Sequence, residues 1–208
     1  MTTYRSFFLF NTVSLLLVIA LIVSAKFSGL SVALLFLPPF TPNHPNVGFL
    51  TRTFQLLCSV PAIICAFSFG LLKTFQPRRK ENLFILCSAL LTGGFLINEI
   101  FRVHIILLRA GVPKLMTILV YATGAGLYGL AFRRRLQSTP YILLLTGLGL
   151  LFFAITVDSL HLNGEGFPSL LEGVPKLFSE LNIALYFWYV CHQEVLHSSI
   201  GQINSPHT

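Results

Sequence analysis

Apolar stretches of about 20 residues recur along the chain, and they constrain its fold more than any other feature. Hydrophobic residues make up 54% of the sequence and charged residues only 10%, whereas a soluble domain carries about 25% charged residues. Because a backbone exposed to lipid must satisfy its own hydrogen bonds, these stretches are expected to be helices. The sequence therefore predicts an all-α, polytopic membrane bundle with about six transmembrane helices. The expected spans are 7–25, 54–75, 83–102, 114–132, 141–158 and 175–192.

Six spans nearly fill the 208 residues, so we expect one bundle over residues 1–192. The apolar segment 27–40 is too short to cross a bilayer and is expected to be interfacial or re-entrant. Residues 193–208 are expected to form a disordered cytoplasmic tail. Residues 1–25 have two interpretations, because Ala25 ends a small-residue pattern typical of signal-peptide cleavage. We favour a retained helix, since the apolar run is long enough to span.

Basic residues cluster in two loops, which predicts the orientation of the chain. Lys73, Arg78, Arg79 and Lys80 lie in one loop and residues 133–135 form the other. Cytoplasmic loops are enriched in lysine and arginine, so both loops are expected inside. With six spans, both termini are then cytoplasmic. The same bias explains the net charge of +7, so no nucleic-acid partner is expected.

Five of the seven acidic residues are expected at the opposite, outward-facing side of the membrane. Acidic side chains at such depths are costly unless paired or hydrated, so they indicate where a site would lie. With nearby cations, they form a predicted polar cluster: Glu99, Arg102, Asp158, His161, Glu172, Lys176 and Glu180, with Glu165 in the same loop.

The first part of this cluster is Glu99 and Arg102. These residues are three positions apart, a spacing that places them on one helix face and predicts an ion pair. His104 lies on another face of a continuous helix, and only a helix end near Arg102 would bring it back to Glu99. The second part is Asp158 and His161, which also share a face. The candidate metal ligands are therefore His104, Asp158 and His161, with a hydrogen-bonded helix terminus as the alternative.

The third part is Glu172, Lys176 and Glu180, which form one stripe at four-residue spacing. Glu172 and Lys176 are in the favourable order for an ion pair, and Ser169 with Glu172 also fits a capping box. Glu180 lies deeper, where Lys176 neutralises it or burial makes it a functional acid. Glu180 is the candidate catalytic residue. At the other end of this span, His192, Glu194 and His197 are interpreted as solvated tail residues rather than metal or haem ligands.

Small residues in the fourth span recur every four positions. Ala122 with Gly126, and Ala125 with Gly129, form small-xxx-small pairs that allow another helix to approach closely. The partner is either a helix of the same bundle or a helix of another subunit.

Three segments resemble uncharacterised multi-pass membrane proteins of photosynthetic bacteria. They are residues 98–104 (NEIFRVH), 138–145 (STPYILLL) and 157–162 (VDSLHL). The resemblance implies a bacterial plasma membrane or a thylakoid membrane as the setting.

Three functions remain in competition. The leading hypothesis is a non-catalytic accessory subunit, or a bundle that binds lipid, pigment or another hydrophobic ligand, in which the charged cluster fixes helix register. The first alternative is a metal-assisted intramembrane enzyme acting on a lipid. The second is a proton- or ion-coupled carrier that uses Glu180, Lys176 and Glu99 as a relay. The cofactor, and whether the protein is an enzyme, are open.

Overall fold

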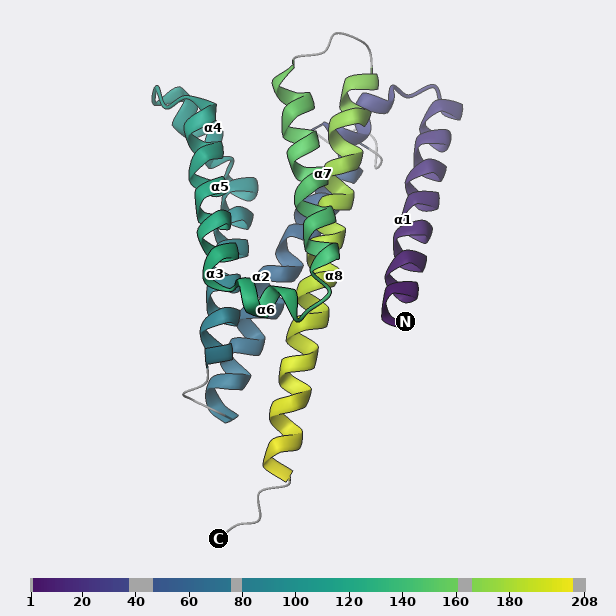
Figure 1. Ribbon diagram of the computed structural model, residues 1–208. Coiled ribbons are helices and arrows are strands. Elements are labelled where there is room, and N and C mark those ends of the chain that lie inside the picture. Colours follow the sequence, from purple (N-terminus) through teal and green to yellow (C-terminus); the bar gives the residue numbers. More distant parts are fainter. Residues whose placement is uncertain (1, 38–46, 76–79, 161–165, 204–208) are drawn as a thin grey trace. The chain divides into compact units, whose positions relative to one another are not determined.

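The computed structural model describes residues 2–37, 47–75, 80–160 and 166–203, and every regular element in these ranges is helical (Figure 1). The prediction of an all-α fold is therefore confirmed. The elements in chain order are α1 (Thr2–Phe27), η1 (Val32–Phe36), α2 (Phe49–Phe75), α3 (Lys80–Phe101), α4 (Val103–Arg109), α5 (Lys114–Ala131), α6 (Arg133–Gln137), α7 (Tyr141–Ser159) and α8 (Phe167–Ile203).

Five of these helices are long and apolar enough to cross a membrane, so the chain is a multi-pass integral membrane protein. The candidate spans in the described part of the chain are Tyr4–Phe27, Phe49–Thr74, Asn82–Phe101, Lys114–Ala131 and Tyr141–Ser159. They agree with the first five expected spans, although α1 and α2 begin about a turn earlier than the apolar pattern suggests.

The sixth expected span, 175–192, lies within α8, which is not among these apolar helices. Its composition is more polar because much of its surface contacts protein and not solvent or lipid. Ser179, Glu180 and Asn182 are at most 4% exposed. A side chain that faces other helices need not be compatible with lipid. The helix also continues to Ile203, so residues 193–203 are helical where a disordered tail is expected from the sequence.

The described part of the chain divides into two compact units, and the single bundle expected from the sequence stays a prediction. The first unit contains the described residues of Met1–Leu57 and Ile142–Leu185, and the second contains those of Cys58–Tyr141 and Tyr186–Thr208. Helices α2 and α8 each contribute residues to both units. Each unit is described separately below.

In the first unit, α7 packs closely against the first half of α8 (Figure 1). Gly147 of α7 makes this approach possible. A Cβ atom at this position would lie 2.8 Å from Ile183 Cγ1 and 3.0 Å from the Ser179 carbonyl oxygen. Gly149, two residues further along the same helix, has nothing within 4 Å of its own Cβ position.

The expected interfacial segment also belongs to this unit, where its residues 32–36 form η1. At about 2 Å rise per residue, this 3₁₀ helix is far too short to cross a bilayer. Val32 and Leu35 are buried, and the Phe36 ring lies directly against the backbone of Gly173 at the start of α8. The Thr51 hydroxyl of α2 donates to the Phe36 carbonyl at 2.8 Å. The segment thus links the beginnings of α2 and α8.

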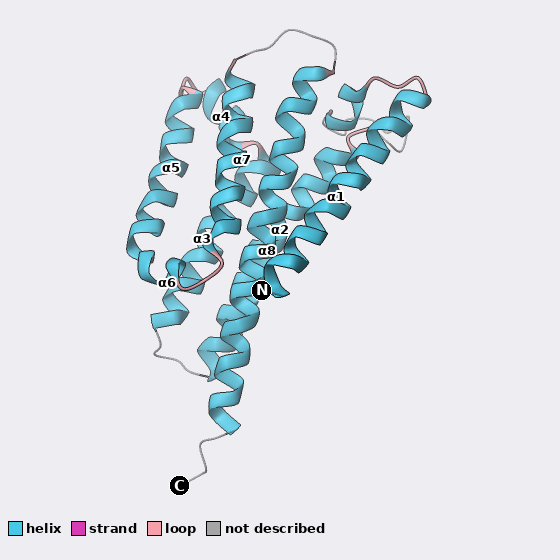
Figure 2. Ribbon diagram, turned by 45° about the vertical axis from the view of Figure 1, so that its right-hand side comes forward, coloured by secondary structure: helices cyan, strands magenta, loops and turns pink. Residues whose placement is uncertain are grey.

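In the second unit, α3 and α5 lie side by side (Figure 2) and are joined by polar contacts within an aromatic cluster. The Ser88 and Tyr128 hydroxyl oxygens are 2.7 Å apart, and the Tyr121 hydroxyl donates to the Gly94 carbonyl at 3.2 Å. The Phe84 ring packs against Tyr128. Hydroxyl groups used in this way hold apolar helices together without leaving polar atoms unpaired in lipid.

Candidate functional site

The residues of the predicted polar cluster are divided between the two units. Asp158, Glu172, Lys176 and Glu180 belong to the first unit, and Glu99 and Arg102 belong to the second. His161 and Glu165 lie outside the described residues. The grouping of the whole cluster at one site stays a prediction.

Within the first unit, Lys176 forms an ion pair with Glu172, as their spacing predicts. The Lys176 Nζ donates to Glu172 Oε1 at 2.6 Å, and both side chains are about one-third exposed. The capping box expected from Ser169 and Glu172 is not formed, because α8 begins at Phe167 and Ser169 is already inside it. Glu172 contributes as an ion-pair partner and not through the Ser169 cap.

Glu180 is only 2% exposed, which makes it a deeply buried acid among the described residues. It lies thirteen residues after the start of α8 at Phe167, or about 20 Å along the helix axis. Ser179, beside it in sequence, is fully buried, and its hydroxyl has no hydrogen-bond partner in the described part of the structure. The role of Glu180 as the candidate catalytic residue stays a prediction.

In the second unit, a helix break at Arg102 brings His104 back towards the end of α3. Arg102 has φ 51° and ψ 45°, a left-handed conformation that is uncommon for a non-glycine residue. The Asn98 side-chain oxygen then accepts a hydrogen bond from the His104 backbone N–H at 3.1 Å, and the Asn98 amide lies 3.5 Å from Glu99 Oε1. Asn98 therefore caps α4 and joins Glu99 to His104.

No metal site is assembled in the part of the chain that the structure describes. Among those residues, no group of three His, Cys, Asp or Glu side chains is arranged to hold a metal ion. His161, a required ligand of the predicted site, lies outside them.

The small residues of α5 lie beside open space. A Cβ atom placed on Gly126 or Gly129 would meet nothing within 4 Å. Ala122 and Gly126 are exposed, and Ala125 and Gly129 are partly exposed. Gly124 instead approaches α3, with a Leu91 methyl 3.8 Å from its Cβ position. The Ala122–Gly126 face therefore takes no part in packing among the described residues.

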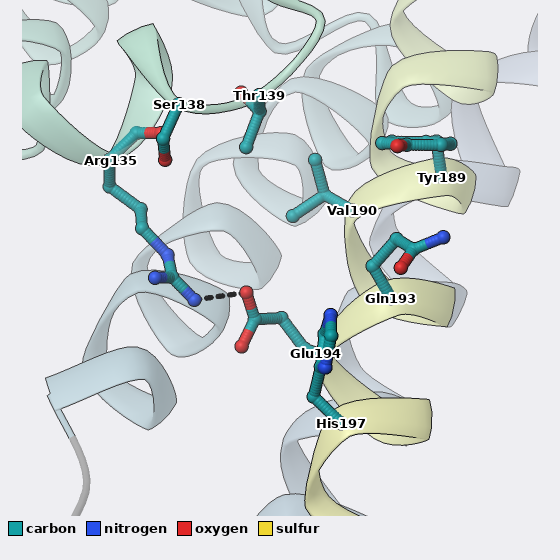
Figure 3. Close-up of a pocket in the computed structure, with 8 residues that line it drawn as sticks. All are labelled: Arg135, Ser138, Thr139, Tyr189, Val190, Gln193, Glu194 and His197. Carbon is teal, nitrogen blue, oxygen red and sulfur yellow. Dashed lines mark hydrogen bonds and ion pairs between the residues drawn. The ribbon is translucent and has the colours of Figure 1, made fainter. Parts of the chain in front are cut away.

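A polar pocket of about 520 Å³ lies in the second unit, between the α6–α7 turn and the last part of α8 (Figure 3). Its lining is almost entirely polar. The lining residues are Arg135, Ser138, Thr139, Tyr189, Val190, Gln193, Glu194 and His197. The five α8 residues come from successive turns of the helix, at spacings of about four residues. Positions four apart share a helix face, so all five line the same side of α8.

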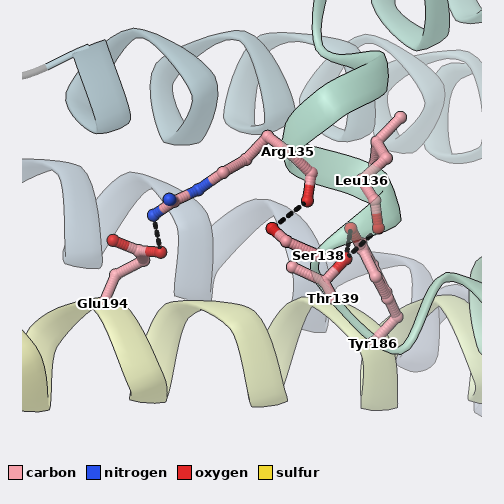
Figure 4. A network of polar contacts seen from close by, with 6 residues as sticks. All are labelled: Arg135, Leu136, Ser138, Thr139, Tyr186 and Glu194. Atoms are coloured by element: carbon pink, nitrogen blue, oxygen red, sulfur yellow. Dashed lines mark hydrogen bonds and ion pairs between the residues drawn. The ribbon is translucent and has the colours of Figure 1, made fainter.

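A network of hydrogen bonds holds the turn against α8 (Figure 4). Arg135 forms an ion pair with Glu194. The Thr139 hydroxyl donates to the Leu136 carbonyl at 2.7 Å and lies 3.0 Å from the hydroxyl of the fully buried Tyr186. The Ser138 hydroxyl donates to the Arg135 carbonyl at 2.8 Å. The pocket walls are therefore fixed by their own contacts.

The sequence does not predict this pocket. The positive-inside bias accounts for the arginines of residues 133–135, and the apolar pattern places Glu194 and His197 in a solvated tail. One signal was present, since Tyr189, Gln193 and His197 continue a four-residue spacing beyond the expected end of the last span. That spacing indicates a helix that continues to at least residue 197.

The fold and these sites define a multi-pass helical membrane protein. The chain belongs to the family described as "Domain of unknown function (DUF8692)", whose model matches residues 11–192. The match includes the α6–α7 side of the pocket and ends before Gln193, Glu194 and His197. No curated protein and no solved structure matches the chain.

Proposed function

We propose that this protein is a non-catalytic accessory subunit of a membrane complex and that it docks onto a partner helix through α5. Six spans place both termini in the cytoplasm, with the 175–192 part of α8 as the sixth span. The resemblance of residues 98–104, 138–145 and 157–162 to proteins of photosynthetic bacteria favours a plasma or thylakoid membrane as its location.

The observation that carries the proposal is the open small-residue face of α5. Gly126 and Gly129 have nothing within 4 Å of their Cβ positions, while the bulky Val120 and Leu127 on the same helix are more than 60% exposed. In lipid, helices associate through close van der Waals packing, and small residues between bulky ones allow it. A partner helix would fill this notch.

The distribution of polar contacts supports a scaffold rather than a catalyst. Two described pairs of polar side chains, Asn11–Asn182 and Ser88–Tyr128, join one helix to another, while hydroxyls such as that of Thr156 bond within their own helix. Such pairs fix helix register, which is the role that the leading hypothesis assigns to polar side chains.

The sixth span is supported by the burial of α8. Its polar residues Ser179, Glu180 and Asn182 are shielded by protein, so the helix can cross a bilayer despite its lower hydropathy. The arginine-rich segment 133–135 then lies on the cytoplasmic side.

Co-purification in a mild detergent tests the docking role. The wild-type protein is expected to bring down a partner subunit in stoichiometric amount. Gly126→Leu, which fills the notch, is expected to lose the partner while remaining folded and membrane-inserted. Gly149→Leu is the matched control, because Gly149 is equally open but lies on α7. A wild-type protein that is always monomeric, or equal loss of the partner in both variants, contradicts the proposal.

A further inference from the structure

We propose that the pocket lined by Arg135, Tyr189, Gln193, Glu194 and His197 binds the phosphate-bearing headgroup of an anionic membrane lipid. This proposal does not rest on the docking role of α5, because the pocket is lined by α6, the turn after it and α8.

The first argument is the depth of the pocket in the membrane. The five-residue helix α6 contains three consecutive arginines, Arg133 to Arg135, and such a cluster is strongly disfavoured in the hydrocarbon region. Tyr141, Trp188 and Tyr189 lie close to the pocket in sequence, and Tyr141 and Trp188 are 46% and 58% exposed. Tyrosine and tryptophan concentrate at the membrane–water interface. The pocket therefore lies at the level of the lipid headgroups.

The second argument is the size and polarity of the pocket. A volume of about 520 Å³ falls within the range of about 300–1,000 Å³ typical of small-ligand sites, and seven of the eight lining residues are polar. Ligand pockets are usually lined mostly by apolar side chains. This lining instead suits the polar part of an amphiphilic molecule.

The third argument is charge. The pocket has one acidic side chain, Glu194, and that carboxylate is paired with Arg135. Arg133 and Arg134 are exposed on the same short helix. Tyr189, Gln193 and His197 carry O–H and N–H groups that can donate to phosphate oxygens. The charges of the lining itself cancel, but with three arginines α6 is positively charged, which favours an anion beside this helix. Basic pockets between transmembrane helices are known to bind anionic lipid headgroups.

The fourth argument distinguishes a lipid from a soluble anion. Trp188 and Leu196 on the pocket-bearing part of α8 are 58% and 42% exposed, so apolar surface borders the polar lining on the same helix. A lipid would contact both at once, with its headgroup in the pocket and its acyl chains along this surface. Free phosphate would gain nothing from the apolar side chains.

Rigidity is the fifth argument. The Arg135–Glu194 ion pair and the Thr139–Tyr186 contact hold the turn in place without a ligand. A preformed site loses little conformational entropy on binding, so a modest number of headgroup contacts suffices for measurable affinity.

Thermal unfolding of the purified full-length protein in detergent tests the proposal, with graded addition of one ligand at a time. Phosphatidylglycerol is expected to raise the unfolding temperature in a saturable manner. Phosphatidylcholine, which has a phosphate but no net charge, and inorganic phosphate are expected to have much smaller effects. An equal effect of inorganic phosphate overturns the lipid assignment, and an equal effect of phosphatidylcholine overturns the requirement for an anion.

Variants locate the binding site. Arg134→Gln removes an exposed charge of α6, next in sequence to the pocket residue Arg135, and it is expected to weaken phosphatidylglycerol binding about fivefold. Gln193→Ala is expected to weaken binding while leaving the lipid-free unfolding temperature unchanged. Arg109→Gln is the matched control, because Arg109 is an exposed arginine of α4 in the same unit. Equal weakening in Arg134→Gln and Arg109→Gln, or no weakening in either Arg134→Gln or Gln193→Ala, overturns the proposal.

Discussion

The side chains of Asn11 on α1 and Asn182 on α8 exchange two hydrogen bonds. Asn11 Nδ2 donates to Asn182 Oδ1 at 3.2 Å, and Asn182 Nδ2 donates back to Asn11 Oδ1 at 3.0 Å. Each amide also donates to a backbone carbonyl of its own helix, that of Phe7 or Phe178. The pair is therefore satisfied on both sides, and it joins two helices of the first unit.

Replacing one member of this pair should destabilise the protein. Asn11→Leu leaves the Asn182 amide, which is 4% exposed, without its cross-helix partner. Hydrogen bonds between membrane helices contribute about 0.6–2 kcal/mol, so we expect a loss of about 1 kcal/mol. Thermal unfolding in detergent measures it. Thr12→Val is the control, because the Thr12 hydroxyl bonds only to the Phe8 carbonyl of its own helix among the described contacts. Equal losses in both variants would contradict the prediction.

The same pair predicts that residues 1–25 are retained in the mature protein. Cleavage after Ala25 would remove Asn11 together with most of α1, and the buried Asn182 amide would lose two hydrogen bonds. We therefore expect the intact mass of protein isolated from membranes to include this helix. N-terminal sequencing that begins at Lys26 would show instead that the segment is a signal peptide.

Gly147 and Gly149 provide a matched comparison for the α7–α8 contact. Gly147→Ala places a methyl group 2.8 Å from Ile183 Cγ1 and 3.0 Å from the Ser179 carbonyl, and overpacking of this kind costs about 1–3 kcal/mol. Gly149→Ala meets nothing within 4 Å and should be neutral or slightly stabilising, because alanine favours helix. Unfolding in a graded detergent series measures the difference, and equal stability of the two variants would argue against this contact.

Cys65 of α2 and Cys191 of α8 are buried in the second unit with their sulfur atoms 3.7 Å apart. A disulfide requires about 2.05 Å, so a small movement would allow one to form. We expect iodine treatment to remove two hydrogens from this thiol pair, giving a disulfide and two iodide ions. Mass spectrometry should locate the bond between peptides containing residues 65 and 191, while Cys58 and Cys87 stay available to maleimide after denaturation. Exclusive cross-linking of Cys58 or Cys87 would refute this pairing.

The sequence predicts the helical spans well, because length and apolarity decide which segments can cross lipid. The ends of α5 and α7 fall within about one residue of the expected limits, since Arg133 and Asp158 mark them clearly. The Glu172–Lys176 pair is also predictable, because four-residue spacing alone brings the two side chains together.

Contacts between segments far apart in the sequence cannot be predicted from hydropathy and local residue spacing. Nothing in the local pattern pairs Asn11 with Asn182, 171 residues away, and the pocket needs α8 to reach the turn after α6. The sequence predicts too early an end for α8, because the apolar signal fades near His192 while the helix continues with polar residues. Hydropathy marks the part of a helix that lies in lipid, and it does not mark where the helix ends.

Compartment-specific labelling tests the proposed orientation of the spans. In a variant lacking the four native cysteines, Arg134→Cys should react with a membrane-impermeant maleimide only after the cytoplasmic side is made accessible, because the arginine-rich segment is assigned to that side. His161→Cys should react from the outside in intact cells. Tyr4→Cys, at the start of the first span, should react from the same side of the membrane as Arg134→Cys. An even number of spans between the two positions returns the chain to that side. Labelling of positions 134 and 161 from one side would exclude a span between them. Opposite sides for positions 4 and 134 would instead exclude the proposed four spans from α1 to α5.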